Sequence, residues 1–408
     1  MLNKKIVFFI SRCDEKSGLL RRIVNMANSL SERGVQMEIL TFSGEREEIF
    51  FPLRTEVLVT SINGKASKTD KGNTKTNKDL HESTKTKDIP NNKKQKTKKS
   101  FLHSVRKSLK SIPAYKHYSI RKNYRKYFLA SNPNVVVVWG SRRLSRAWYA
   151  TRGMNCKIFD AEFNSFEKTF PRDDNENNRV LKKCNGLIVQ TLHEKEMFRP
   201  YCSRVFVINN PISDQLPQPF SGTRNKRIVN FCRISPQKNL GLLIDSFELF
   251  YKEYKDYSLH IYGDVSVDVP SDYSYMETLV DMIKKKRLEN AVFLHSSRED
   301  IHQVILDSAM FVSSSDFEGL SNSMLEAMAI GMPCICTDCM GGGTREVMKD
   351  HENGLIVPMN DKNEMYRAMK EFADNPDLAK TCSKNATKIR ELLSTDNIVK
   401  QWIKVLCE

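Results

Sequence analysis

Short apolar runs alternate along this chain with longer segments in which hydrophobic residues recur every three or four positions. The apolar runs are rich in Val, Ile and Phe, as at 135–138 and 310–313. Such runs are typical of strands that are buried on both faces of a parallel sheet. The segments between them have the spacing of amphipathic helices. The pattern therefore predicts an α/β fold in which helices cover both faces of parallel sheets.

The predicted strands fall into two groups. The first group comprises residues 6–10, 37–41, 135–138, 157–159, 186–189 and 205–208, and the second comprises 227–231, 258–262, 292–295, 310–313, 334–337 and 354–357. A chain of 408 residues also exceeds what one hydrophobic core usually serves. Two doubly wound, parallel-sheet domains are therefore expected.

The segment between the second and third predicted strands departs from this pattern. Residues 64–100 are mainly Lys, Thr, Asn and Asp, with almost no apolar side chain. Such a composition cannot bury a core, so we expect a disordered, Lys-rich insertion at about 64–100. Between Lys65 and Lys126 there are twenty Lys and Arg against four Asp and Glu, which accounts for the whole formal charge of +16.

Hydrophobic residues return at roughly helical spacing among the basic ones at 101–127. Clustered Lys and Arg contribute on the order of 1 kcal/mol each beside anionic lipid, so the stretch from Lys65 to Lys126 could dock on an anionic membrane surface. The alternative is a solvated loop followed by an ordinary surface helix. Nucleic acid is not expected as a partner, because no recognised binding module surrounds the basic residues.

The ten cysteines show no pattern of a secreted disulfide framework, which favours reduced thiols. Cys334, Cys336 and Cys339 could bind a metal, but no His or second cysteine pair stands nearby, so no metal site is expected. No apolar run approaches the roughly 20 residues that span a bilayer, and the first residues lead directly into a strand rather than a signal peptide. We expect a cytoplasmic protein, with a peripheral position on the inner face of the plasma membrane as the option that the basic segment leaves open.

The densest group of candidate site residues is F-E-G-L-S-N-S-M-L-E-A-M-A at 317–329. After an apolar strand, the residues from Gly319 to Ser323 can turn tightly and end in a Ser/Asn cap, and helical spacing follows. A helix that begins in this way presents free N–H groups and a positive dipole end, which suits a phosphate. Glu318 precedes the turn and Glu326 lies about two turns into the helix. A capped helix with solvated carboxylates is the alternative.

This segment resembles the paired glutamates, with seven residues between them, of retaining GT-B glycosyltransferases of the family 4 type. The run C-R-I-S-P-Q-K-N at 232–239 is similar to that family's G-R-L-x-x-x-K-N, with Arg233 and Lys238 at its diphosphate-binding basic positions and Cys232 in place of its glycine. L-H-I-Y-G-D at 259–264, C-M-G-G-G-T-R-E-V at 339–347 and N-G-L-I-V-P at 353–358 follow in family order. The resemblance therefore covers about residues 227–360.

The N-terminal half resembles the family less closely. K-I-V-F-F-I-S at 5–11, a loop with Gly18 and the helical pattern at 19–33 are similar to the family's opening strand, glycine loop and helix. D-A-E-F-N-S-F at 160–166 resembles the segment in which many bacterial polysaccharide transferases carry Glu, a basic residue and Asn. Phe163 occupies the basic position, and a phenyl ring cannot hydrogen-bond a hydroxyl or a phosphate.

The resemblance implies a GT-B fold of two Rossmann-like domains that face each other across a cleft. An N-terminal acceptor-side domain would comprise residues 1–211, and a nucleotide-sugar-binding domain residues 212–394. A final helix at 395–408 would cross back to the first domain. The implied donor-binding residues are Gly18, Arg233, Lys238, Gly263, Arg298, Glu318, Gly319, Leu320, Ser321, Asn322 and Glu326.

The same resemblance implies a retaining transferase that moves a sugar from a nucleotide-diphosphate sugar, with UDP expected, to a saccharide acceptor. The acceptor would be a polyprenyl-diphosphate-linked intermediate of capsule or other cell-surface polysaccharide. Arg233 and Lys238 would neutralise the leaving diphosphate. The chain has no Asp-x-Asp, and neither a metal nor another cofactor is expected.

In this reading Glu326 would accept hydrogen bonds from the ribose hydroxyls and Glu318 would lie by the donor sugar. The sequence leaves open whether Glu318 acts as a nucleophile or as an electrostatic stabiliser. Glu162 is our candidate for assisting the acceptor hydroxyl, although it could equally cap a turn. Two other functions remain: a sugar-nucleotide epimerase of the same fold, or an inactive scaffold that docks at membranes.

Overall fold

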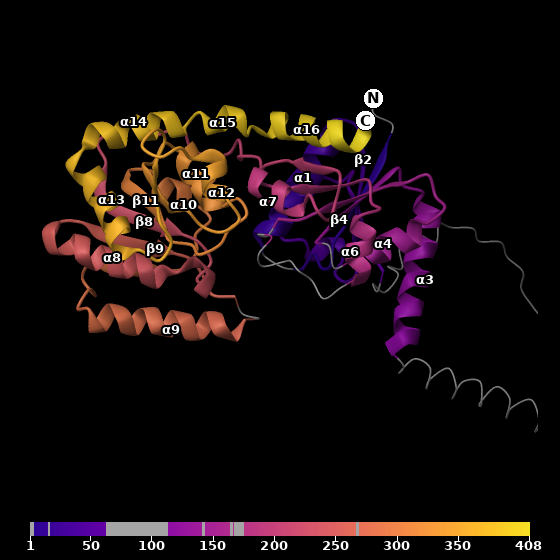
Figure 1. The fold of residues 1–408 in the computed structure, drawn as a ribbon, viewed down its shortest axis with the longest axis horizontal. Helices are drawn as coiled ribbons and strands as arrows, with labels where there is room; N and C mark the ends of the chain where they lie inside the picture. Colours follow the sequence, from indigo (N-terminus) through magenta and orange to yellow (C-terminus); the bar gives the residue numbers. More distant parts are fainter. Residues whose placement is uncertain are drawn as a thin grey trace, which may run out of the picture.

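The computed structural model describes residues 4–14, 17–62, 113–140, 143–163, 166, 175–266 and 269–408. The insertion expected at about 64–100 lies outside the described residues, as does the first part of the basic segment at 101–127. Within the described residues the chain forms two parallel sheets with helices around them (Figure 1). The predicted α/β class with two Rossmann-like domains is confirmed.

The N-terminal sheet has seven parallel strands in the order β3-β2-β1-β4-β5-β6-β7. Successive side chains of β1 point to opposite faces of this sheet, because side chains alternate along a strand. Ile6 and Phe8 pack with α1 and α16, whereas Val7 and Phe9 pack with α3, α4, α6 and α7. The strands are β1 (Lys5–Phe9), β2 (Gln36–Thr41), β3 (Leu58–Ser61), β4 (Val135–Trp139), β5 (Lys157–Ala161), β6 (Gly186–Val189) and β7 (Val205–Val207).

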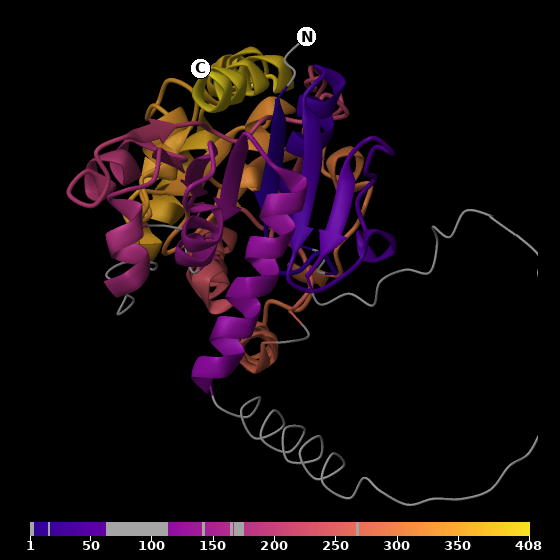
Figure 2. The ribbon, with the colours of Figure 1, turned by 90° about the vertical axis from the view of Figure 1, so that its right-hand side faces the viewer.

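The helices of the N-terminal domain complete its two cores. Figure 2 shows α3 crossing one side of the sheet, with its first residues extending beyond the body of the domain. The buried Tyr124 and Phe128 hold α3 against β1 and β4. The helices are α1 (Gly18–Glu32), η1 (Arg46–Glu48), α3 (Pro113–Ser131), α4 (Leu144–Thr151), α6 (Asn175–Leu181) and α7 (Leu192–Phe198).

The C-terminal sheet has six parallel strands in the order β10-β9-β8-β11-β12-β13. One face packs on α8, α9 and α13, and the other packs on α10 and α11. The strands are β8 (Asn225–Phe231), β9 (Ser258–Tyr262), β10 (Val292–His295), β11 (Ser308–Ser313), β12 (Cys334–Thr337) and β13 (Leu355–Val357). The helices are η3 (Pro236–Lys238), α8 (Leu240–Glu253), α9 (Pro270–Lys285), α10 (Ile301–Val304), α11 (Asn322–Ala329), α12 (Gly343–Val347), α13 (Lys362–Asp374), α14 (Pro376–Ala386), α15 (Ile389–Leu392) and α16 (Thr395–Cys407).

Each strand predicted from the sequence is present, within a few residues of its expected bounds. The sequence pattern missed β3, an edge strand of four residues, none of which is fully buried. Its short, half-exposed run gives almost no hydrophobic signal, and the low-complexity segment begins directly after it.

Helix α16 leaves the C-terminal domain and packs on the N-terminal sheet, as Figure 1 shows along the top of the molecule. Trp402 is the centre of this contact. Its ring stacks on Trp139 with centroids 5.5 Å apart and lies 6.0 Å from the ring of Phe8. Arg33, directly after α1, also forms an ion pair with Asp396 of α16.

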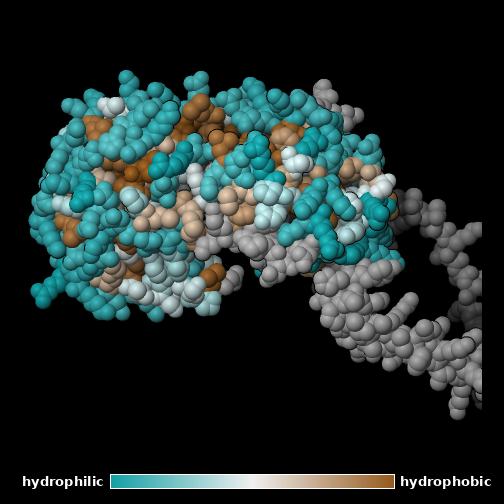
Figure 3. Space-filling model, viewed as in Figure 1, coloured by the Kyte–Doolittle hydropathy of each residue, from teal (hydrophilic) through white to brown (hydrophobic). Residues whose placement is uncertain are grey.

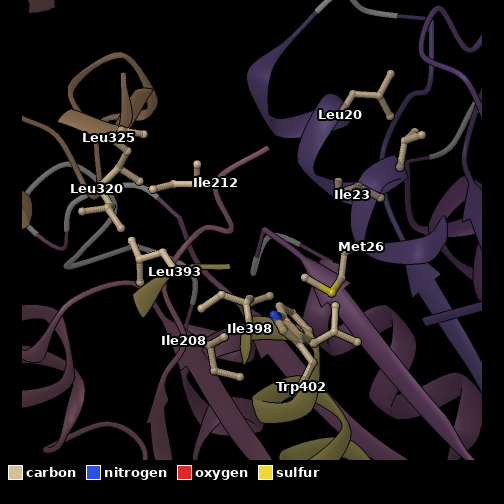
Figure 4. Close-up of a cluster of buried hydrophobic side chains, with 14 of the residues drawn as sticks. Leu20, Ile23, Met26, Ile208, Ile212, Leu320, Leu325, Leu393, Ile398 and Trp402 are labelled. Atoms are coloured by element: carbon tan, nitrogen blue, oxygen red, sulfur yellow. The ribbon is translucent and has the colours of Figure 1, made fainter. Parts of the chain in front are cut away.

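One hydrophobic cluster runs continuously from the N-terminal domain through α16 into the C-terminal domain. Figure 4 shows α1 side chains on one side of this cluster, the region of α11 on the other and residues of α16 between them. The side chains labelled are Leu20, Ile23, Met26, Ile208, Ile212, Leu320, Leu325, Leu393, Ile398 and Trp402. On the face in Figure 3 hydrophilic residues predominate, and hydrophobic ones gather toward the upper middle of the view.

Candidate active site

Helix α11 begins at the carboxyl end of β11, after a loop at 314–321, as the glutamate motif predicted. Ser321 is its N-cap residue, but its side chain makes no cap hydrogen bond. The Ser321 Oγ lies 3.1 Å from the Ser323 Oγ instead. The prediction that a Ser hydroxyl caps this helix is therefore wrong for Ser321. Because the Ser321 side chain does not accept from the N–H groups of the first turn, these groups can bind an anion.

The first turns of α1 and α11 meet, although they belong to different domains. A Cβ added to Gly18 would lie 3.6 Å from the Asn322 Nδ2. The Arg22 Nη2 donates to the Asn322 Oδ1 over 3.4 Å. Two helix N-termini that converge in this way add their positive dipole ends at one place. This meeting point is the candidate anion site.

Lys238 and Glu318, both predicted site residues, form an ion pair, and each side chain is 15% exposed. Ser315 also donates to Glu318, over 3.2 Å between its Oγ and the Glu318 Oε1. Burial, the largest effect, lowers the pKa of Lys238, but the neighbouring Glu318 carboxylate outweighs it and the pKa is raised overall. Lys238 therefore stays charged at neutral pH.

Glu326 is held by two partners, one from each domain. His302 Nε2 lies 3.0 Å from the Glu326 Oε2, and Arg21 of α1 forms an ion pair with the Oε1. Burial raises the pKa of Glu326, but the hydrogen bond with His302 and the charge of Arg21 outweigh this, and the pKa lies below its ordinary value. The carboxylate is thus ionised and available as a hydrogen-bond acceptor.

At Gly319 the N-terminal domain closely approaches the glutamate loop. A Cβ added there would lie 2.9 Å from the Gln190 Oε1 and 3.0 Å from the Phe163 carbonyl oxygen. The Gln190 Oε1 also accepts a hydrogen bond from the Leu320 N–H over 3.3 Å. Only a residue without a side chain fits between the two domains at this position.

A second contact between the domains lies next to the first. Thr191 Oγ1 donates to the Gly341 carbonyl oxygen over 2.9 Å, and the Leu192 N–H donates to the Glu346 Oε2 over 2.8 Å. The segment that follows β6 is thus hydrogen-bonded to the loop before α11, at Leu320, and to the loop before α12, at Gly341.

Gly263 lies where the end of β9 crosses the loop after β8. A Cβ added to it would approach within 1.8 Å of the Cys232 carbonyl oxygen. The expected glycine is therefore required by close approach of two backbones.

Three predicted residues are placed less centrally. Arg233 is 53% exposed, and its Nε lies 3.9 Å from the buried carboxylate of Asp272. Arg298 is exposed and makes a two-pronged contact with Asp300, over 2.8 and 2.9 Å. Glu162 is buried, directly after β5. Their roles toward a substrate stay predictions.

The structure adds four residues that the sequence did not suggest: Arg21, Arg22, Gln190 and His302. Each contacts a predicted residue from another part of the chain. A pair of arginines early in an amphipathic helix reads as an ordinary solvated face, so the sequence carries no signal for their position.

Among the residues that the structure describes, no group of three or more His, Cys, Asp or Glu side chains could hold a metal ion. In the same part of the chain, no helix is long and apolar enough to cross a membrane.

Comparison with known proteins places this arrangement in a class. Residues 213–389 match the family model described as glycosyl transferases group 1. An uncharacterized glycosyltransferase of Haemophilus influenzae is 22% identical over 99% of this chain and 100% of its own length. A poly(ribitol-phosphate) alpha-N-acetylglucosaminyltransferase of Staphylococcus aureus is 29% identical, over 55% of this chain and 44% of its own length.

Solved structures share the fold over nearly the whole chain. TarM superposes with a TM-score of 0.73 at 16% identity, covering 99% of both chains. Anabaena HepE, solved in complex with UDP, superposes with a TM-score of 0.71 at 16% identity, again covering 99% of both. The two facing parallel-sheet domains are thus the GT-B architecture.

The family match, the relatives and the fold together support a group 1 glycosyltransferase, as the sequence motifs predicted. Membership of family 4 stays a prediction, as does retention of configuration.

Proposed function

We propose that this protein transfers a sugar from a UDP-sugar to a saccharide acceptor of a cell-surface glycan, with retention and without a metal ion. The observation that carries the proposal is the meeting of the α1 and α11 N-termini beside Lys238, Glu318 and Glu326. Positive dipole ends and a buried cation would stabilise a leaving diphosphate. The two carboxylates would bind the ribose and the transferred sugar.

The roles within the site follow from the geometry and the resemblance. Glu326, ionised between His302 and Arg21, would accept hydrogen bonds from ribose hydroxyls. Lys238 would move from Glu318 toward the diphosphate when the donor binds, which would leave Glu318 for the sugar. Arg233, with its exposed side chain, would swing onto the same diphosphate.

The acceptor side rests on the relatives. One relative, from Campylobacter jejuni, is named for transfer of N-acetylgalactosamine onto a sugar linked to diphospho-undecaprenol. The S. aureus relative is named for glycosylation of poly(ribitol phosphate). A phosphate-containing or lipid-linked glycan is accordingly the acceptor class that we propose, with Glu162 near its hydroxyl.

Thermal stabilisation by UDP-, GDP-, ADP-, CMP- and dTDP-sugars in EDTA tests the donor. We expect stabilisation by one nucleotide class, UDP, and loss of it in Glu326→Ala. The anomeric configuration of the product, measured by NMR, tests retention. Stabilisation that requires Mg²⁺ would contradict the metal-independent mechanism, and an inverted product would contradict retention.

The basic residues between Lys65 and Lys126 support a further element of the proposal, docking on an anionic membrane. Co-sedimentation with vesicles of phosphatidylglycerol and phosphatidylcholine should exceed that with phosphatidylcholine alone, and it should fall when residues 65–99 are deleted. Equal binding to both vesicles would contradict docking by charge.

A further inference from the structure

Arg22 is a partly buried cation whose hydrogen-bonding capacity is not fully used. Its side chain is partly buried, and its Nε–H has no acceptor within hydrogen-bond distance among the residues that the structure describes. In that part of the chain its hydrogen bond is the one to the neutral Asn322, and no ion pair of Arg22 is seen. A buried donor without an acceptor is costly, by about 1 to 3 kcal/mol. A bound anion would remove that cost.

The guanidinium is held in place by an aromatic platform. Its Cζ lies 4.8 Å from the centre of the Phe163 ring. Phe163 stacks on Trp139 with centroids 4.9 Å apart, and Trp139 stacks on Trp402. A planar guanidinium packs well on a ring that is itself fixed, so fewer orientations are lost when it binds a ligand. Phe163, which stands where the resemblance expected a basic residue, thus supports a cation that comes from α1.

The charges around Arg22 indicate which part of a donor it would meet. Burial lowers its pKa to about 9, with a further contribution from Arg21, while Glu318 and Glu194 act in the opposite direction. Arg22 therefore remains charged at neutral pH. Arg21 lies at Glu326, the residue that we assign to the ribose, whereas Arg22 lies within the electrostatic reach of Glu318, which we assign to the sugar. The phosphate next to the sugar is the β-phosphate.

We infer that Arg22, positioned on Phe163, binds the β-phosphate of the donor and stabilises the leaving diphosphate from the N-terminal domain. This inference rests on the proposed function. It makes the charge stabilisation two-sided, with Lys238 on one domain and Arg22 on the other. A donor that carries both phosphates would thereby contact cations of both domains, whereas a nucleoside monophosphate would not reach Arg22.

The test is nucleotide affinity measured by calorimetry with two probes, UDP and UMP, which differ in the β-phosphate. In Arg22→Ala we expect UDP affinity to fall about tenfold or more, since a charged hydrogen bond to phosphate is lost. UMP affinity should change less than about threefold, because UMP lacks the β-phosphate and its own contacts are not altered by the substitution. Arg22→Lys should recover part of the loss, and Phe163→Leu should lose UDP affinity with UMP unchanged. The control is Arg199→Ala, an exposed arginine of the same domain, which should bind both probes as the wild type does.

An equal loss of UDP and UMP affinity in Arg22→Ala would overturn the inference, because a change of fold or of the nucleoside pocket gives that result. So would unchanged UDP affinity. Failure of the wild type to bind UDP at all would instead overturn the proposed donor. The two failures are thus distinguishable, and circular dichroism of each variant confirms that it is folded.

Discussion

The Lys238 ammonium and the Glu318 carboxylate form an ion pair between the end of η3 and the loop before α11, although eighty positions separate them in sequence. Other hydrogen bonds between the same two segments support it. The Gln237 side chain donates to the Phe317 carbonyl oxygen over 2.8 Å, and the Asp316 N–H donates to the Gln237 carbonyl oxygen over 3.0 Å. The pair is therefore part of a fixed junction and not a chance contact of two flexible side chains.

Breaking this ion pair from one side should destabilise the protein more than removing both charges. Lys238→Met leaves a largely buried carboxylate unpaired, and we expect the free energy of unfolding to fall by about 3 kcal/mol. The double variant Lys238→Met with Glu318→Gln, which removes both charges, should be more stable than Lys238→Met alone. Urea denaturation of the four proteins measures this. As the matched control, Lys226→Met breaks an exposed pair with Asp256 and should leave the free energy of unfolding nearly unchanged, because solvent screens the pair.

Glu326→Gln should lower the free energy of unfolding at neutral pH. The difference from the wild type should become smaller as the solution becomes acidic. The pKa of Glu326 lies below its ordinary value of 4.5, since His302 and Arg21 outweigh burial. A carboxylate with a depressed pKa contributes stability that is present above its unfolded-state pKa and is lost as pH falls through its folded-state pKa. Denaturant titrations of wild type and variant from about pH 7 to pH 3 should therefore converge at the acid end. A difference that is the same at every pH would mean that the carboxyl charge is not what stabilises.

Gly263→Ala should destabilise the C-terminal domain, because its new Cβ would meet the Cys232 carbonyl oxygen at 1.8 Å. Overpacking against backbone should cost about 2 kcal/mol or more. Gly241→Ala in α8 provides the contrast, since its Cβ would meet nothing closer than the Met282 sulfur of α9, at 3.8 Å. That change should be neutral or stabilising by up to about 1 kcal/mol. Differential scanning calorimetry distinguishes them, and equal melting temperatures would contradict the close approach.

Trp402→Ala should uncouple the two domains as well as destabilise the protein. The side chain is 2% exposed and packs on Trp139 and Phe8, and its removal should cost about 3 to 5 kcal/mol. Because α16 carries the shared cluster, we expect a broadened or double calorimetric transition. Leu392→Ala, at a side chain that is 67% exposed, should leave the transition unchanged. A single sharp transition in both variants would show that other contacts couple the domains.

The sequence predicted the sheets well and the contacts between them poorly. Strand β4 contains a continuous run of Val, which is typical of a parallel strand buried on both faces. Leu58 and its neighbours in β3 gave no such signal, because an edge strand buries little. The crossing of the helix at 395–408 came from the resemblance, and Trp402 on Trp139 now gives it a physical cause. The domain limits at 211 and 394 stay predictions.

At the site, the sequence named Lys238, Glu318 and Glu326, whose roles stay predictions, but it could not supply the partners that the structure gives them. Arg21 and His302 are separated from Glu326 by 305 and 24 positions. Nothing in their local sequence distinguishes them from surface residues. Phe163 was noticed only as a residue that could not do what a basic one does, and its ring contact with Arg22 depends on tertiary packing.

The packing of α16 on β1 and β4 also constrains the order in which the chain can fold. Phe8 is made early in synthesis, whereas the indole that covers it belongs to Trp402. During translation the face of the N-terminal sheet that carries Phe8 stays exposed to solvent until α16, which follows the C-terminal domain, has been synthesised. Completion of the N-terminal core therefore depends on synthesis of the C-terminal domain that precedes α16.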